Sequence, residues 1–162
     1  MSKLYYPDWQ IRRVLRDTDV IAMVGASSNW NRPSYFAMKY LQEKGYRVIP
    51  VNPRAAGDTL LGEEVYTNLK DIPVHIDMVD IFQRSDRVPP VVDEAIEVGV
   101  KVIWMQLTVR HDEAAKKAAD AGITVIMDRC PKIEFGRLTG ELGWSGINTR
   151  VITSRRSRRI RA

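Results

Sequence analysis

Five short apolar segments recur along the chain, and the segments between them have the apolar spacing of helices. This alternation constrains the fold more than any other feature. A strand buried on both faces of a sheet reads as a continuous apolar run, whereas a helix repeats apolar residues three and four positions apart. Helices are expected from Asp8, from Pro33 up to Gly45, over 91–98 and over 112–121, with a short helix around 68–71. Strands are expected at 20–24, 46–51, 76–81, 101–105 and 123–127.

Strands that alternate with helices of about ten residues form right-handed strand–helix–strand units in a parallel sheet, with helices on both faces. The sequence therefore predicts a doubly wound α/β domain of the Rossmann type with a five-stranded parallel sheet. We expect the strand order 3-2-1-4-5, counted along the chain. In that order the winding reverses between the first and fourth strands, so a ligand crevice is expected beyond their carboxyl ends.

The positive charge of the chain is concentrated at its end. The net charge is +5, but the segment from Arg150 to Ala162 holds six Arg and no acid, so the rest of the chain carries −1. At 162 residues the chain fits one domain. We expect a domain over 1–140 and a basic, mobile C-terminal tail over 141–162. A basic nucleic-acid-binding face on the domain is not expected.

The sequence shows no membrane or metal signature. No apolar run approaches the roughly 20 residues that cross a bilayer, and the first residues lack the apolar core of a secretory signal. A cytoplasmic protein that contacts no membrane is therefore expected. A lone Cys130 and two His leave no internal disulfide and are too few for a typical structural zinc site.

The segment after the first strand, GASSNWNRPS, is the first candidate for ligand binding. Gly25 permits a tight turn, and the amides of residues 26–28 together with the start of the next helix favour a phosphate group. The complete G-x-G-x-x-G pattern and the Lys of a P-loop are both absent. A plain connecting loop is the alternative interpretation.

The second strand ends in Asn52, Pro53 and Arg54. Folds that bind NAD usually place Asp or Glu here, to hold the 2′-hydroxyl of the ribose. An Arg suits a phosphorylated ribose instead, either the 2′-phosphate of NADP or the 3′-phosphate of coenzyme A. NAD is thereby disfavoured, and a solvated loop cation is the alternative for Arg54.

Polar and aromatic residues also follow the third and fourth strands. Phe82 can form a wall against an adenine ring, and Arg84 can face a pyrophosphate. The amide of Gln106 lies near the expected crevice and can bind a polar group such as a pantetheine chain. Ordinary packing, solvation or a loop hydrogen bond is the alternative for each of the three.

No set of residues has the spacing of a catalytic group. Arg129 and Lys132 lie near Cys130 in the sequence, and such charges can lower the pKa of a thiol, but an unreactive packing role is the preferred interpretation. His75 and His111 have no Ser or Asp partner at the spacing of a triad. We therefore assign no catalytic residue.

With these residues identified, the chain from about Asp8 to Leu138 resembles the small CoA-binding protein family. These proteins are single Rossmann domains related to the nucleotide domain of the succinyl-CoA synthetase alpha subunit. The resemblance rests on several motifs in order, namely VGAS, NRPS, IPVNPR, the stretch at 62–66, IWMQL and MDRCPKIE.

The resemblance implies that coenzyme A is the ligand. The residues it assigns to binding are Gly25, Ala26, Ser27, Arg32 and Ser34 in the first loop and helix start, Asn52, Pro53 and Arg54 around the adenosine end, and Phe82, Arg84 and Gln106 along the rest. Cys130 and Pro131 resemble an Asn-Cys-Pro segment of the synthetase. The phosphohistidine of the synthetase belongs to a further domain, so ligase activity is not implied.

Three functions follow from these observations. The preferred one is binding of coenzyme A or an acyl-CoA without chemistry of its own. An NADP-dependent oxidoreductase is the first alternative, although no Tyr-Lys or His-Asp pair is present to donate a proton. Nucleic-acid binding through the Arg-rich tail is the second. The acyl group, the protein partners and the oligomeric state are left open.

Overall fold

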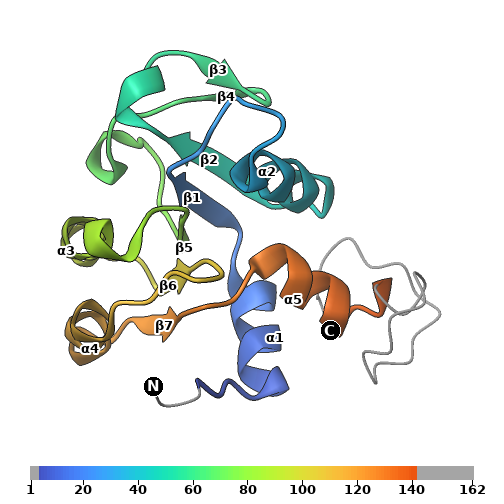
Figure 1. The fold of residues 1–162 in the computed structure, drawn as a ribbon, viewed down its shortest axis with the longest axis vertical. Coiled ribbons are helices and arrows are strands. Elements are labelled where there is room, and N and C mark those ends of the chain that lie inside the picture. Colours follow the sequence, from blue (N-terminus) through green and yellow to red (C-terminus); the bar gives the residue numbers. More distant parts are fainter. Residues whose placement is uncertain (1–3, 142–162) are drawn as a thin grey trace.

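A parallel sheet of five strands runs through the middle of the domain (Figure 1). The computed structural model describes residues 4–141. The strands are β1 (Val20–Val24), β2 (Arg47–Val51), β5 (Met78–Ile81), β6 (Val102–Met105) and β7 (Thr124–Ile126). All their pairings are parallel. The predicted α/β class and each of the five predicted strands are therefore confirmed.

Helices cover both faces of this sheet (Figure 1). On one face lie α3 (Val88–Val98) and α4 (Asp112–Asp120). On the other lie α1 (Asp8–Asp17), α2 (Pro33–Glu43) and α5 (Pro131–Leu138). Three short 3₁₀ helices lie in the connections: η1 (Pro53–Ala55), η2 (Leu69–Asp71) and η3 (Ser85–Arg87). The sequence predicted the first four long helices and η2, but α5 was not predicted.

Alternate residues of β1 point to opposite faces, and both faces are buried. Ile21 and Met23 pack in one core with α1, α2 and α5. Ala22 and Val24 pack in the other core with α3 and α4. Two covered faces require apolar residues at every position, and this is why the strand reads as a continuous apolar run.

The predicted strand order is wrong in one respect. The observed order is β2-β1-β5-β6-β7, which is 2-1-3-4-5 along the chain. The outer edge of β2, where the third strand was expected, is occupied by Tyr66, whose amide donates to Pro50 O at 3.0 Å and whose carbonyl accepts from Asn52 N at 2.9 Å. Tyr66 follows a small antiparallel pair, β3 (Thr59–Leu60) and β4 (Glu63–Glu64).

The chain then passes to the free edge of β1, where it forms β5. The winding consequently reverses between β1 and β5, not between the first and fourth strands. In doubly wound sheets ligands bind beyond the carboxyl ends at this reversal. The crevice is therefore expected beside the loops that follow β1 and β5.

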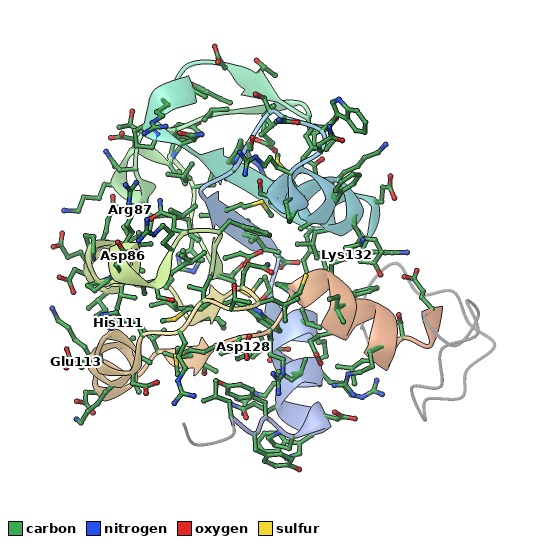
Figure 2. The ribbon with its side chains drawn as sticks, viewed as in Figure 1. Asp86, Arg87, His111, Glu113, Asp128 and Lys132 are labelled. Atoms are coloured by element: carbon green, nitrogen blue, oxygen red, sulfur yellow. The ribbon has the colours of Figure 1, made fainter. Side chains whose placement is uncertain are left out.

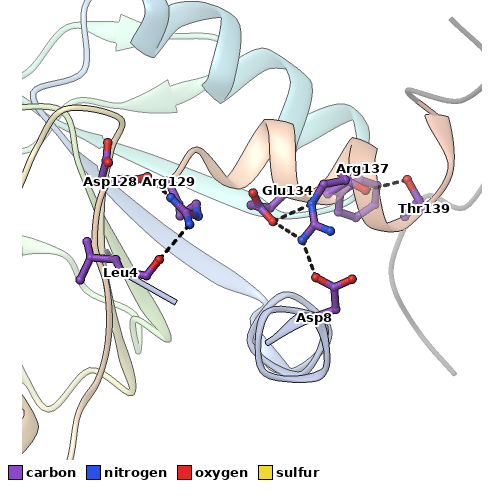
Figure 3. Close-up of polar contacts among 8 residues, drawn as sticks. Leu4, Asp8, Asp128, Arg129, Glu134, Arg137 and Thr139 are labelled. Atoms are coloured by element: carbon purple, nitrogen blue, oxygen red, sulfur yellow. Dashed lines mark hydrogen bonds and ion pairs between the residues drawn. The ribbon is translucent and has the colours of Figure 1, made fainter. Parts of the chain in front are cut away.

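Polar contacts fix α5 against the start of the chain (Figure 3). Arg137 Nη2 donates to Glu134 Oε2 at 2.6 Å and to Asp8 Oδ1 at 2.8 Å, so it joins α5 to α1. In the segment before α5, Arg129 donates to the carbonyl of Leu4 at 3.4 Å. These contacts hold the start of α5 at the carboxyl end of β7.

The basic tail predicted over 141–162 lies outside the described residues, apart from Glu141. Within residues 4–141 no helix is long and apolar enough to cross a membrane.

Candidate functional site

A cavity of about 1130 Å³ opens at the carboxyl ends of the strands. Its walls come from the start of α2, from segments 82–86 and 106–109 after β5 and β6, and from the start of α5. Asp86 and Lys132 are both in its lining, and Figure 2 shows Asp86 beside α3 and Lys132 at α5, on opposite sides of the strands in this view. The predicted residues Phe82, Arg84 and Gln106 all line this large pocket. It lies at the corrected position of the reversal, between β1 and β5.

A buried carboxyl group lies against Gln106. Asp80 is fully buried in β5, where it is paired in register with Met23 of β1 and Trp104 of β6. Gln106 Nε2 donates to Asp80 Oδ1 at 2.9 Å and to Oδ2 at 3.0 Å. Burial raises the pKa of Asp80 to about 8, against the opposing effect of this hydrogen bond. Because the contact uses Nε2, Gln106 can offer its carbonyl oxygen Oε1 to a ligand.

Gly25 is required by a close approach between two backbone segments. Its φ is +87°, a conformation that other residues rarely adopt. A Cβ at this position would lie 2.2 Å from the carbonyl oxygen of Phe82. Gly25 therefore brings the loop after β1 into direct contact with the loop after β5, and both loops border the reversal of the winding.

Five of the predicted binding residues form hydrogen bonds within and between the first two loops. The amide of Ser27 donates to Ser34 Oγ at 3.2 Å, and Asn52 Nδ2 donates to the carbonyl of Ala26 at 2.8 Å. Asn52 Oδ1 in turn accepts from the amide of Arg54 at 3.0 Å. The Ser34 hydroxyl and the Asn52 amide thus have partners within the protein, and they shape the loops that border the pocket.

The start of α2 is favourable for an anion. Its N-cap residue is the exposed Arg32, and no side chain caps the helix. Uncapped amides give a helix N-terminus a partial positive charge. Among residues 4–141, Arg32 and Arg54 form no ion pair, and both are exposed. They are not in the lining of the large pocket but lie in the loops that follow β1 and β2.

A second pocket of about 390 Å³ adjoins the first. Gln83 and Asp86 line both pockets, so the two lie side by side. Pro53 and Arg87 also line the smaller pocket. Of the predicted adenosine-side residues, only Pro53 is in its lining, and Arg54 is the next residue along the chain.

Several residues of the two pockets were not predicted as site residues. Gln83 lies two residues after β5, a position that could have identified it, and Arg87 ends η3, farther along the same connection. The apolar residues Phe36, Leu107 and Ile133 also line the large pocket. No pattern in the sequence distinguishes such residues from members of the core.

Cys130 lines the large pocket. Burial raises the pKa of its thiol, and the amide of Ile133 and the charge of Lys132 only partly oppose this shift. Arg129 contacts the Tyr6 ring and the carbonyls of Leu4 and Asp128. The raised pKa agrees with the preferred interpretation of Cys130 as a packing residue and not with the alternative of a thiol activated by its flanking charges.

Comparison with known proteins identifies the family. The model of the CoA binding domain matches residues 19–136. The chain is 38% identical over 124 residues to the uncharacterized protein YneT of Bacillus subtilis (strain 168), covering 76% of this chain and 90% of that protein. A solved structure of a hypothetical protein from Pyrococcus horikoshii OT3 superposes with a TM-score of 0.79 at 38% identity, over 85% of this chain and 99% of that one.

A longer enzyme contains a similar region. The alpha subunit of acetate–CoA ligase (ADP-forming) I of Pyrococcus furiosus is 34% identical over 87 residues, which are 51% of this chain and 19% of the subunit. The match thus covers only a small part of that subunit. The family model, the similar folds and this partial match agree with the resemblance carried by the sequence motifs, and the chain belongs to the family of CoA-binding domains.

Proposed function

We propose that this protein binds coenzyme A or an acyl-CoA across the two adjoining pockets. The observation that carries the proposal is that Gln83 and Asp86 line both pockets, so two pockets with different linings lie side by side. They form the smaller and the larger end of the proposed site. The smaller end has Arg87 in its lining and the exposed Arg54 next to Pro53. The larger end is lined mainly by apolar and neutral residues. Coenzyme A likewise joins a phosphorylated adenosine to a neutral pantetheine arm.

The chemistry of the lining supports this orientation. Arg54 and Arg87 can bind the 3′-phosphate of the adenosine by charge-assisted hydrogen bonds. The carboxylates of Asp86 and Glu94, also in the lining of the smaller pocket, can accept from ribose hydroxyls. In the larger pocket, Gln106 Oε1 can accept from an amide N–H of the pantetheine chain. In this proposal the domain binds its ligand and carries out no chemistry of its own.

A calorimetric titration of one protein sample with coenzyme A, 3′-dephospho-CoA, NADPH and NADH tests the proposal. Coenzyme A should bind more tightly than the dephospho form by about one to two decades, since a hydrogen-bonded charge contact is worth about 1.5 to 3 kcal/mol. Arg54→Ala should remove much of this difference. Arg13→Ala, on the exposed side of α1, is the matched control and should leave it unchanged.

Two results would contradict the proposal. Tighter binding of NADPH than of coenzyme A would assign the site to a dinucleotide. Equal affinity of the wild-type protein for coenzyme A and its dephospho form would mean that no residue of the loop after β2 binds the 3′-phosphate.

A further inference from the structure

Three large apolar side chains are exposed around the opening of the large pocket. Phe36 of α2, Leu107 after β6 and Ile133 of α5 are 49%, 48% and 44% exposed, and all three line this pocket. They make up half of the large hydrophobic residues that are exposed within residues 4–141, although they come from three separate elements. Apolar groups that gather at a cavity indicate a binding surface, unlike apolar residues scattered singly. We call these three residues the apolar mouth.

The backbone fixes Leu107 in this mouth. The next residue, Thr108, has a φ of 68°, which is rare and costly for a β-branched residue. Its amide donates to Asp128 Oδ1 at 2.7 Å, and the amide of Asp128 donates to the carbonyl of Val109 at 3.2 Å. Asp128 itself has a φ of 54°. Two residues in unfavourable conformations thus hold each other in place, and the loop presents Leu107 at the pocket in a defined position.

Beside the apolar mouth, the lining of the pocket also includes an amide and a thiol. Gln106 and Cys130 line it, and Gln106 is held by the buried Asp80. If the pantetheine arm runs from the smaller pocket past Gln83 and Gln106, its sulfur end reaches the region enclosed by Cys130 and the apolar mouth. Anything attached to that sulfur then lies against Phe36, Leu107 and Ile133.

We propose that the apolar mouth holds the hydrocarbon chain of an acyl-CoA, so that the ligand of this protein is a medium-chain acyl-CoA in preference to free coenzyme A. This inference rests on the proposed function and names its ligand class. Burying a hydrocarbon chain removes apolar surface from water on both the ligand and the three side chains. Free coenzyme A would leave all three side chains in water.

The lining favours an uncharged chain over one that ends in a carboxylate. The lining of the large pocket includes the carboxylate of Asp86, which would repel a second carboxylate. Arg84 Nε lies 3.1 Å from Asp86 Oδ1, so Arg84 already has an acidic partner. The ammonium of Lys132 lies 5.5 Å from the centre of the Tyr40 ring, in a cation–π contact. A carboxylate among the apolar mouth would lose its hydration with little compensation.

The test is a calorimetric titration of the whole protein with coenzyme A, acetyl-CoA, succinyl-CoA and octanoyl-CoA. Each buried methylene group strengthens binding up to about fourfold, so octanoyl-CoA should bind at least about tenfold more tightly than coenzyme A, acetyl-CoA or succinyl-CoA. The variants Leu107→Ser and Ile133→Ser should remove most of this preference, measured within each variant as the ratio of its affinities for octanoyl-CoA and coenzyme A. Trp9→Ser is the matched control, because Trp9 is exposed but lines a pocket at the amino ends of the strands.

Failure of this inference is distinguishable from failure of the proposed function. Equal affinities for octanoyl-CoA and coenzyme A would overturn the acyl assignment and leave coenzyme A binding intact. Tighter binding of succinyl-CoA than of octanoyl-CoA would also overturn it, in favour of a charged acyl group. No binding of any CoA compound would overturn the proposed function itself. A second copy of this chain is the alternative occupant of the apolar mouth, and analytical ultracentrifugation tests for it. Equal affinities for octanoyl-CoA and coenzyme A, together with a dimer that Leu107→Ser dissociates, would overturn the proposal in favour of a contact between two copies.

Discussion

Asp77 and Asp80 lie three positions apart, just before and within β5, and the pKa values of their carboxyl groups are shifted in opposite directions. Burial raises the pKa of Asp80 to about 8, because Gln106 is its only hydrogen-bond partner within the described residues. Burial also acts on Asp77, but the amides of Val20 and Asp19 and the ammonium of Lys101 outweigh it and lower the pKa. The two carboxyl groups therefore make the free energy of unfolding depend on pH in opposite directions.

Replacing Asp80 with Asn should reduce the loss of stability that accompanies a rise in pH. The folded protein keeps the Asp80 proton up to a pH of about 8, whereas the unfolded chain releases it near 3.8. Between these values the folded state binds more protons, so the free energy of unfolding falls as the pH rises, by at most about 1.4 kcal/mol per pH unit. An Asn has no such proton, and the stability of the variant relative to the wild type should therefore increase with pH.

Urea unfolding of both proteins at about pH 5.5 and about pH 7.5 measures this effect. Identical pH slopes for the wild type and Asp80→Asn would mean that the carboxyl group at position 80 does not hold a proton in the folded state.

Asp77→Asn should show the opposite pattern. The folded pKa of Asp77 is below its ordinary value of 3.8, so its stabilising effect is present at neutral pH and is lost as the pH falls through the folded pKa. The variant should be less stable than the wild type by about 1 to 3 kcal/mol at neutral pH, since charge-assisted hydrogen bonds are lost. The deficit should shrink below a pH of about 4. A deficit that stays constant into acid, measured by thermal unfolding across this range, would assign it to packing and not to the charge.

Gly25→Ala should destabilise the protein far more than Gly57→Ala, although the two glycines have nearly the same φ, +87° and +88°. At Gly57 no atom lies within 4 Å of an added Cβ, so only the left-handed backbone is penalised, by about 1 to 2 kcal/mol. At Gly25 the added carbon would lie 2.2 Å from Phe82 O, so the two loops would have to separate. We expect a loss of about 3 kcal/mol or more in the free energy of unfolding. Similar losses for the two variants would contradict the close approach.

The sequence predicted the strands well because each of them is covered on both faces. In Val20–Val24, for example, burial of both faces requires an uninterrupted apolar run. The order of the strands is not encoded in such runs. It depends on whether the chain covers the outer edge of β2 after leaving it, and Tyr66 does so through backbone hydrogen bonds that leave no mark on the sequence pattern.

The site was predictable only in part, for a related reason. Gln106 could be identified because it directly follows a strand whose carboxyl end borders the pocket. Leu107 and Ile133 could not, because apolar residues in a sequence are assigned to the core by default. Their exposure depends on how far α2, the loop after β6 and α5 stand apart, and α5 itself was not predicted.

Arg137→Met should destabilise the fold, because Arg137 holds α5 through the contacts drawn in Figure 3. Two residues of α5, Lys132 and Ile133, line the large pocket. The Arg137 guanidinium group lies 2.6 Å from Glu134 Oε2 and 2.8 Å from Asp8 Oδ1. Without it the buried carboxylate of Glu134 loses its cation, which should cost about 2 kcal/mol or more. Arg13→Met is the control, because Arg13 pairs with Asp17 at 3.8 Å with both side chains exposed, and such pairs contribute at most about 1 kcal/mol. Urea unfolding measures both variants. Equal losses for the two would show that the ion pairs of Arg137 with Glu134 and Asp8 stabilise the domain no more than a surface ion pair does.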